Sequence, residues 1–186
     1  MNTQNLTTTD AATVALTFRD AVAKDVAAIV TLVESAYRGD ASRAGWTTEA
    51  DLLDGQRVDP AGVQEIIGKP NSRVLLGETA GRLIVCCHIE KQGDAGYFGM
   101  FSVQPGLQNG GVGKLTMTEA ERIARDEWRC TKMEMTVISV RNELIAWYER
   151  RGYRRSGRYK PFPYGDARYG LPKRDDLRFE FLEKSL

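Results

Sequence analysis

The sequence predicts a mixed α/β fold in a single domain, and three observations lead to this prediction. Its 186 residues are close to the usual size of one compact domain. Along the chain, apolar residues alternate between the spacing of strands and the spacing of helices. No internal repeat and no Pro/Gly/Ser-rich linker divides the chain. We therefore expect one domain over residues 13–186, preceded by a flexible tail at residues 1–12.

The first predicted elements are one strand and two helices. Residues 14–19 read as a strand, and apolar residues recur at helical spacing from Asp25 until Gly39 ends the run. The segment 38–59 is polar and irregular, with a short helical piece at about 48–53. A second helix is expected over 60–67, because proline stands at its first position and a glycine follows its end.

Three strands follow in quick succession. They are predicted over residues 73–79, 82–91 and 96–103. The connections between them, Ala80-Gly81 and residues 92–94, are too short for a crossover. Turns this short join antiparallel neighbours, so we expect a meander.

The remaining elements alternate between helix and strand. A helix over about 112–128 is expected to turn Val112, Leu115, Ala120, Ile123 and Ala124 inward. The later helix is expected to be capped by Asn142 and ended by Gly152. The further elements are a strand at 132–139, that helix at 142–151, a strand at 153–159, a loop at 160–174 and a final strand at 177–183.

Composition limits the classes of partner and cofactor. The formal net charge is +1, so no overall field favours nucleic acid or a membrane. His88 is the single histidine and no Cys-x-x-Cys pair occurs, so we expect no metal site. Cys86, Cys87 and Cys130 lie in apolar runs and are expected as reduced core thiols. We see no signal peptide and no run of about 18 apolar residues, and expect a cytoplasmic protein.

A glycine-rich turn at residues 105–113 (PGLQNGGVG) joins the meander to the next helix. Such a turn suits a phosphate group, because the helix N-terminus offers unpaired N–H groups and a partial positive charge. A P-loop would need glycine at 108 and Ser or Thr at 115, where the chain has Gln108 and Leu115. A dinucleotide fingerprint fails at Thr116 and lacks the preceding βαβ unit. A turn without ligand is disfavoured, because its glycines weaken the start of the helix.

A third pattern fits the turn. Residues 103–113 (VQPGLQNGGVG) resemble the V-x-P-x-x-[QR]-x-x-G-x-[GA] signature of the GNAT acetyltransferases, with Gln108, Gly111 and Gly113 at its defining positions. Residues 142–153 (NELIAWYERRGY) resemble a second family segment, in which Asn and Tyr lie six residues apart. The resemblance covers roughly residues 14 to 183. It implies a mostly antiparallel sheet splayed between its fourth and fifth strands, helices on both faces, and acetyl-CoA as co-substrate.

The resemblance also implies a site for acetyl-CoA. The pantetheine arm is expected in the gap near Phe101, bonded by the backbone of Phe101 and Val103 as an added strand would be. The pyrophosphate is expected on the N–H groups of Asn109 through Lys114, and Asn142 resembles a position that touches the pantetheine arm or simply caps its helix. The expected donor-site residues are Phe101, Ser102, Val103, Gln108, Asn109, Gly110, Gly111, Val112, Gly113, Lys114, Asn142 and Tyr148.

In this family, a neutral amine attacks the thioester directly and coenzyme A leaves as a thiolate. Tyr148 resembles the family's general acid, which serves that thiolate. The strand before the glycine turn carries no acidic residue, although many family members place their base there. Glu90, which shares a strand face with His88, is the favoured base, and a water chain is the alternative.

The acceptor is less defined. Segments 38–59 and 160–174 are expected to flank it, with Trp46, Glu49 and Tyr164 as candidate contacts. Acids in the first segment suit a cationic amine, whereas the basic and aromatic second segment suits an anionic or aromatic partner. The main hypothesis is acetylation of a primary amine on a small molecule. Acetylation of a protein or peptide amine, and a non-catalytic acyl-CoA-binding protein, are the alternatives. A homodimer is left open.

Overall fold

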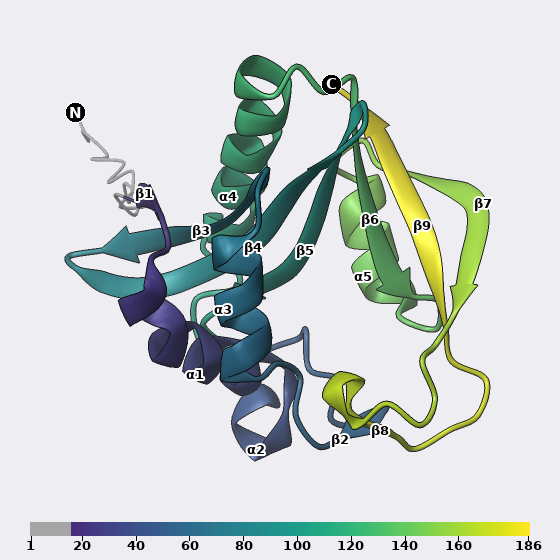
Figure 1. Ribbon diagram of the computed structural model, residues 1–186. Helices are drawn as coiled ribbons and strands as arrows, with labels where there is room; N and C mark the ends of the chain where they lie inside the picture. Colours follow the sequence, from purple (N-terminus) through teal and green to yellow (C-terminus); the bar gives the residue numbers. More distant parts are fainter. Residues whose placement is uncertain (1–15) are drawn as a thin grey trace, which may run out of the picture.

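The computed structural model describes residues 16–186. Val14 and Ala15 of the predicted first strand, and the predicted tail at 1–12, lie outside the described residues. The described chain forms a seven-stranded sheet in the order β1-β3-β4-β5-β6-β9-β7 (Figure 1). Only β5 and β6 are parallel, which confirms the predicted, mostly antiparallel sheet. The strands are β1 (Thr17–Asp20), β3 (Ser72–Thr79), β4 (Arg82–Gln92), β5 (Ala95–Val103), β6 (Lys132–Ile138), β7 (Arg154–Pro161) and β9 (Arg178–Ser185).

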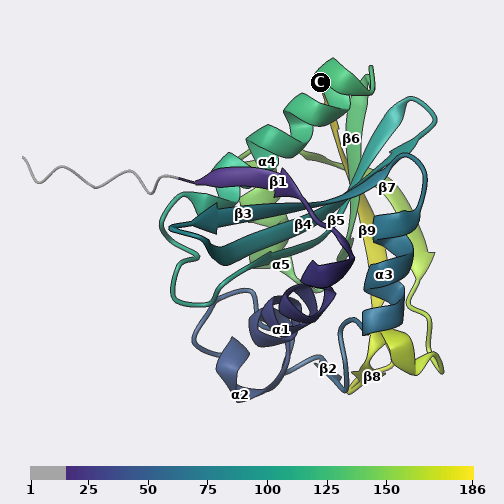
Figure 2. The ribbon, with the colours of Figure 1, turned by 60° about the vertical axis from the view of Figure 1, so that its left-hand side comes forward.

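Helices cover both faces of the sheet, as predicted (Figure 2). Strand β3 contributes side chains to both faces of the sheet. Val74 and Leu76 pack with α1 and α3, whereas Leu75 between them packs with α4 and α5 on the opposite face. Because successive side chains of a strand point to opposite faces, a continuous apolar run is buried on both sides. The helices of the first face are α1 (Val26–Tyr37) and α3 (Pro60–Gly68), and those of the second are α4 (Val112–Arg122) and α5 (Asn142–Glu149).

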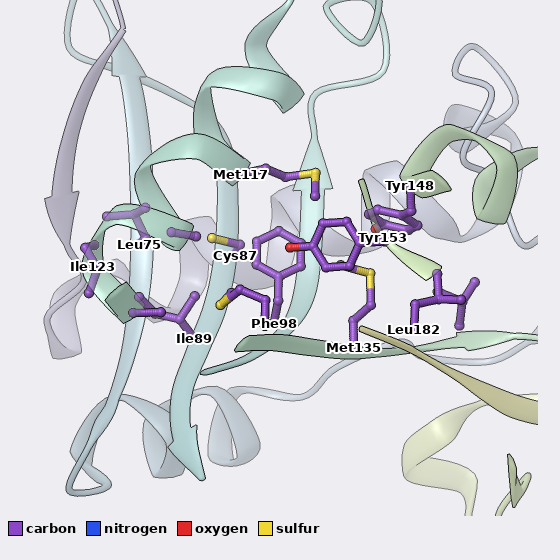
Figure 3. Close-up of a cluster of buried hydrophobic side chains, with 14 of the residues drawn as sticks. Leu75, Cys87, Ile89, Phe98, Met117, Ile123, Met135, Tyr148, Tyr153 and Leu182 are labelled. Atoms are coloured by element: carbon purple, nitrogen blue, oxygen red, sulfur yellow. The ribbon is translucent and has the colours of Figure 1, made fainter. Parts of the chain in front are cut away.

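The larger hydrophobic core lies on the α4–α5 face. Phe98 from β5, Met135 from β6 and Tyr148 from α5 are all 5% exposed or less. Figure 3 shows Phe98 between the side chains of β3 and β4 and a group formed by Met135, Tyr148 and Tyr153. Buried side chains therefore connect β5 and β6 where their backbones no longer pair.

The gap between β5 and β6 is the main irregularity of the sheet. The two strands pair only from Ala95–Lys132 to Tyr97–Glu134 and then diverge, which confirms the predicted splay. A β-bulge interrupts the pairing of β5 with β4 in the same region, and Met100 there has a φ of 46°. A bulge bends its strand and redirects nearby backbone groups. The sequence analysis did not predict this bulge, because Met is an unusual residue in a left-handed conformation.

The two long irregular segments meet in a second, two-stranded sheet. β2 (Leu53–Asp54) pairs antiparallel with β8 (Leu171–Pro172). Lys173 extends this contact, since its N–H donates to Leu52 O at 2.9 Å and its Nζ to Ala50 O at 2.7 Å. We call the β2–β8 pair and the Lys173 bonds the clasp. It joins the segment after α1 to the segment between β7 and β9 (Figure 1).

Three local predictions are wrong. Residues 48–52 form irregular chain and turns that lead into β2, and the short helix of this segment is α2 (Gly39–Ser42). Here Glu49 N–H bonds back to the Tyr37 carbonyl at 3.0 Å, so tertiary contacts override the local helical tendency. Leu115 is 42% exposed, not buried on α4. Asn142 is the first residue of α5, and Arg141 holds the N-cap position without a side-chain cap.

The remaining features of residues 16–186 concern the cysteines, membrane-spanning helices and metal ligands. Cys86, Cys87 and Cys130 are buried free thiols, as predicted, and burial raises the pKa of Cys86 to about 12. No helix within residues 16–186 is long and apolar enough to cross a membrane. The same residues contain no group of three His, Cys, Asp or Glu side chains that would hold a metal ion.

Candidate functional site

A narrow cleft lies where β5 and β6 part. Its walls come from both strands, from the C-terminal end of α1 and from α5, and about 50 Å³ of space remains between the side chains. Phe101 and Tyr148 face this cleft from different elements. The cleft thus brings together two residues that the sequence analysis singled out separately. Its lining also includes Tyr37, Glu49, Arg57, Met100, Arg141 and Leu144.

The backbone of Phe101 is engaged by a residue that the sequence analysis missed. The Tyr37 hydroxyl donates a hydrogen bond to the Phe101 carbonyl oxygen. The β-bulge leaves Phe101 outside the regular pairing with β4, so its carbonyl is available to a side chain. Burial raises the pKa of Tyr37, and the hydroxyl therefore keeps its proton at neutral pH. Helical periodicity marks Tyr37 only as a core position, so no sequence signal distinguishes it.

Tyr148 presents a free hydroxyl to the cleft. Its ring packs edge-on against Trp147 and Tyr153, with centroids 5.2 and 6.0 Å away. Its hydroxyl forms no hydrogen bond with any residue of the described chain. Burial, and then the neighbouring Tyr37, raises the pKa of Tyr148 above its ordinary value of about 10. Tyr148 is therefore a protonated donor at neutral pH.

The glycine turn ends in a left-handed N-cap. Gly111 caps α4 with a φ of 80°, a conformation that glycine adopts without steric cost. The first bond of the helix runs from Leu115 N–H to Gly111 O at 3.1 Å. The N–H groups of Val112, Gly113 and Lys114 therefore have no acceptor within the helix. These donors and the helix dipole favour an anion at this position.

Gly113 serves packing as well as access. A Cβ atom at this position would lie 3.2 Å from Phe101 Cζ and 3.3 Å from Trp147 Cζ2. Glycine therefore lets the first turn of α4 approach the two aromatic rings beside the cleft. This packing role is separate from the phosphate site that the sequence predicts at this turn.

Gln108 connects the glycine turn to the loop after α1. Its Oε1 accepts from Trp46 N–H at 2.9 Å, and its Nε2 donates to Thr47 Oγ1 at 2.9 Å. Nε2 also lies 3.3 Å from Val103 O. A Cβ atom at Gly45 would come within 2.6 Å of Gln108 Oε1. The amide is thus fully used in positioning two loops.

Trp46 lies beside the glycine turn. Its ring is 6.1 Å from that of Trp147, and the two line a hollow of about 410 Å³ with Asn109 and Arg150. The predicted contacts Trp46 and Glu49 are therefore on separate surfaces, since Glu49 lines the cleft. Among the other expected donor-site residues, Ser102 and Val103 are buried on β5, whereas Lys114 and Asn142 are exposed.

Glu49 is surrounded by three arginines, which we call the arginine cluster (Arg38, Arg57 and Arg141). Its Oε2 is 2.6 Å from Arg38 Nη1 and its Oε1 is 3.0 Å from Arg141 Nη1. Arg57 Nε lies farther away, at 3.7 Å from Oε2. Burial alone would raise the pKa of Glu49, but the charges of Arg141, Arg57 and Arg38 outweigh burial and lower it. The expectation that Glu49 suits a cationic amine therefore needs correction, because its charge is already compensated.

Glu90 is not among the residues that line the cleft. Its Oε1 pairs with Lys69 Nζ at 2.6 Å, and its Oε2 is 3.8 Å from His88 Nε2. His88 Nε2 bonds to Ser72 Oγ at 2.9 Å, and burial lowers the pKa of His88 to about 4. The structure thus does not bring the predicted base to Tyr148.

Tyr164 holds its own loop together. Its hydroxyl accepts from Leu177 N–H at 2.7 Å and donates to Arg174 O at 3.2 Å. The ring packs edge-on against Phe162 at 5.3 Å. Tyr164 does not line the cleft, so its predicted contact with the acceptor is not reproduced by this arrangement.

Solved structures share this architecture. The IAA acetyltransferase from Bacillus cereus has a TM-score of 0.64 at 14% identity, over 92% of this chain and 100% of that chain. The ribosomal-protein-S18-alanine N-acetyltransferase from Escherichia coli has a TM-score of 0.67 at 11% identity, over 91% and 93%. A structure from Bacillus anthracis in complex with acetyl coenzyme A has a TM-score of 0.55 at 18% identity, over 66% of each chain. At these identities the likeness shows the fold.

The sequence comparisons give the family. No curated protein sequence matches the chain. The model of the acetyltransferase (GNAT) family matches residues 32–153, which is more than half of the chain and includes the glycine turn, α5 and the cleft-lining residues other than Phe179. The chain therefore belongs to the GNAT acetyltransferases, whose enzymes use acetyl-CoA as co-substrate.

Proposed function

We propose that the protein is an N-acetyltransferase that moves an acetyl group directly from acetyl-CoA to a primary amine of a small molecule. The observation that carries this proposal is the cleft, which Phe101 and Tyr148 line from different elements. Direct transfer needs this pairing, because the thioester must lie between backbone donors and a group that serves the leaving sulfur.

The residues present fit the donor. The pantetheine arm would lie along β5 at Phe101–Val103, as an added strand in the gap. The pyrophosphate would lie on the residues 109–114, where Val112, Gly113 and Lys114 have unpaired N–H groups. Gly111 leaves open space, since a Cβ atom there would meet nothing within 4 Å. Entry of the arm requires Tyr37 to release the Phe101 carbonyl, or the arm to use another backbone group.

Tyr148 acts on the leaving thiolate. A model thiol has a pKa of about 8.5, below the ordinary tyrosine value of about 10. Burial raises the pKa of Tyr148 further, so complete proton transfer to the thiolate is uphill. Tyr148 therefore donates a hydrogen bond to the sulfur as charge develops, and solvent completes the protonation.

Proton removal from the amine falls to water. Glu49 is the single Asp or Glu among the described residues that line the cleft, and its lowered pKa makes it a poor base. Glu90 is held by Lys69 outside the cleft. Water in the cleft is the remaining acceptor, which is the alternative that the sequence left open.

The clasp supports a small acceptor. It joins residues 50–54 to residues 171–173 through the backbone pairing of β2 with β8 and two hydrogen bonds donated by Lys173. A peptide needs an open groove that admits chain on both sides of the reacting amine. A small amine needs only a pocket, which fits the clasp.

A coupled binding and turnover experiment tests the proposal. Acetyl-CoA should raise the unfolding free energy by about 2.7 kcal/mol at a hundredfold excess over Kd, and ATP should do much less. Release of free coenzyme A should depend on a small amine and not on peptides with free amino groups. Preference for peptides would replace the small acceptor with a protein one. Binding of acetyl-CoA without any turnover would indicate a non-catalytic acyl-CoA-binding protein.

A further inference from the structure

The arginine cluster carries more positive charge than the protein neutralises. Three guanidinium groups surround the single carboxylate of Glu49, which is 4% exposed. The next carboxylate, Glu34, uses its Oε1 to accept the backbone N–H groups of Arg57 and Val58, at 2.6 and 3.0 Å. Even with Glu34 included, one positive charge remains unbalanced beside the cleft. Buried charge of this kind is costly unless a partner neutralises it.

Arg57 is the member of the cluster whose charged group has no hydrogen-bonded carboxylate. Both oxygens of Glu49 are taken by Arg38 and Arg141, and the contact of Arg57 with Glu49, at 3.7 Å, is too long for a hydrogen bond. The guanidinium group makes no hydrogen bond with any side chain of residues 16–186. It lies 5.4 Å over the ring of Tyr37 and is 30% exposed. An arginine held in this way offers a planar fork of donors that matches a carboxylate or a phosphoryl group.

Arg38 also has donors without acceptors, although it lines neither the cleft nor the neighbouring hollow. Arg38 is 7% exposed, and two of its buried nitrogens, Nε and Nη2, have no hydrogen-bond partner among the described residues. Buried donors without acceptors are rare in folded proteins. The cluster is therefore short of acceptor oxygens as well as negative charge.

The position of Arg57 links the cluster to an open hollow. Arg57 and Met100 line both the cleft and a neighbouring hollow of about 370 Å³, which also contains His88 and Tyr97. A molecule in the hollow that placed an anion on Arg57 would have its other end at the cleft. Acidic residues of the hollow, Asp59 and Glu65, lie on the α3 side, and Asp59 is used to cap α3 through Gly62 N–H at 2.8 Å.

We propose that the acetyl acceptor is a small amine that carries an anionic oxygen group, and that Arg57 binds this group at the mouth of the cleft with Arg141 as a second donor. The proposal rests on the proposed acetyltransferase function. A carboxylate and a phosphoryl group share the required chemistry. A polyamine does not, because its additional ammonium groups would face unbalanced arginines.

Matched amine pairs test the proposal. With saturating acetyl-CoA, release of coenzyme A is measured for β-alanine and β-alaninamide, for 2-aminoethylphosphonate and ethylamine, and for spermidine. We expect kcat/KM at least tenfold higher for the anionic member of each pair. A larger ratio for the carboxylate pair would identify a carboxylate acceptor, and a larger ratio for the phosphonate pair a phosphoryl one. Equal rates within both pairs, or preference for spermidine or a peptide, would overturn the proposal and leave the acetyltransferase function intact.

Variants of Arg57 distinguish binding of the anionic group from a purely structural role, because only binding should change KM for the anionic amine alone. Arg57→Gln should raise KM for the anionic amine at least tenfold, with kcat, the Kd of acetyl-CoA and the KM of the neutral analogue little changed. Arg57→Lys should restore part of the loss, because it keeps the charge and loses the fork. Arg43→Gln, which removes an exposed partner of Asp51, is the matched control. Equal losses for charged and neutral amines in Arg57→Gln would contradict the assignment.

If none of these probes is acetylated, their binding can still be measured as a thermal shift in the presence of acetyl-CoA. The anionic probes should raise Tm in the wild-type chain and not in Arg57→Gln. Failure of every anionic probe in both assays would refute the proposal. Failure of acetyl-CoA itself to bind would instead refute the proposed function.

Discussion

The glycine turn and the arginine cluster are built in different ways. The glycine turn and the start of α4 come from one continuous stretch, residues 103–113, and act through backbone N–H groups. The arginine cluster and the Glu49 that it surrounds come from separate segments and act through side chains. A backbone site demands particular residue types at fixed spacing, whereas a side-chain site demands only that the fold bring charges together. The first kind identifies a family, and the second can change with the substrate.

The largest expected effect concerns stability at the arginine cluster. Glu49→Gln removes the carboxylate that three arginines share, so the free energy of unfolding should fall by about 3–5 kcal/mol. Asp51→Asn, two residues away, removes a carboxylate that is 77% exposed and pairs with Arg43, and should leave the free energy of unfolding close to that of the wild type. Urea unfolding of both variants measures the difference. Equal losses would show that the cluster is no more than a surface network.

The next effect concerns catalysis. Tyr148→Phe keeps the ring that packs against Trp147 and Tyr153, and loses the hydroxyl in the cleft. We expect kcat to fall about a hundredfold or more with little change in KM for acetyl-CoA, because the hydroxyl acts as charge develops. The substitution should change the free energy of unfolding by less than about 1 kcal/mol, as measured by thermal unfolding.

Tyr153→Phe is the matched control for this experiment. The Tyr153 hydroxyl bonds to Glu121 Oε1 at 3.1 Å and does not line the cleft. Its loss should leave kcat within about threefold of the wild type. A fully active Tyr148→Phe enzyme would show that Tyr148 is only an aromatic residue of the core.

A third effect follows from His88, which lines the hollow next to the cleft. Burial lowers the pKa of His88 to about 4, against about 6.5 in the unfolded chain. The unfolded state therefore binds more protons between these values, and stability falls as the pH drops through this window. At pH 5 the loss should be about 2 kcal/mol relative to pH 8. His88→Gln should remove this part of the pH dependence in urea unfolding, and an unchanged slope would contradict the buried neutral histidine.

The smallest effect concerns the backbone of the glycine turn. Gly111→Ala forces a side chain into a left-handed conformation, which should cost about 1 kcal/mol of stability. Gly106→Ala, in the same turn and with open space around the position, should stay within about 0.5 kcal/mol. Isothermal titration with acetyl-CoA should show weaker binding for the first variant alone. Similar affinities for the two variants would show that the pyrophosphate does not bind at Gly111.

Much of the fold was predictable from the sequence. The β3–β4–β5 meander follows from short turns, and α3 follows from Pro60 at its start and Gly68 at its end. The splay between β5 and β6 required the family resemblance, because periodicity does not tell how far two strands stay paired. The helix expected at residues 48–53 is wrong because Glu49 is held by distant arginines and by Tyr37.

The candidate site was predictable where the backbone determines it. Gly111 and Tyr148 could be named from spacing within one segment. Tyr37, Arg57 and Arg141 could not, since each is an ordinary helix or loop residue until the fold brings it to the cleft. Glu90 and Tyr164 were plausible by type and strand position, yet their partners are Lys69 and the backbone of their own loop.

The clasp has a mechanical consequence for the whole sheet. At one end of the cleft the two halves of the sheet share three backbone-paired positions, which act as a pivot. At the other end the β2–β8 pair and the Lys173 bonds act as a latch. Because the two halves of the sheet are joined at both of these places, the angle between them is fixed. That angle, and with it the width of any molecule that can pass between the halves, changes only when the latch yields.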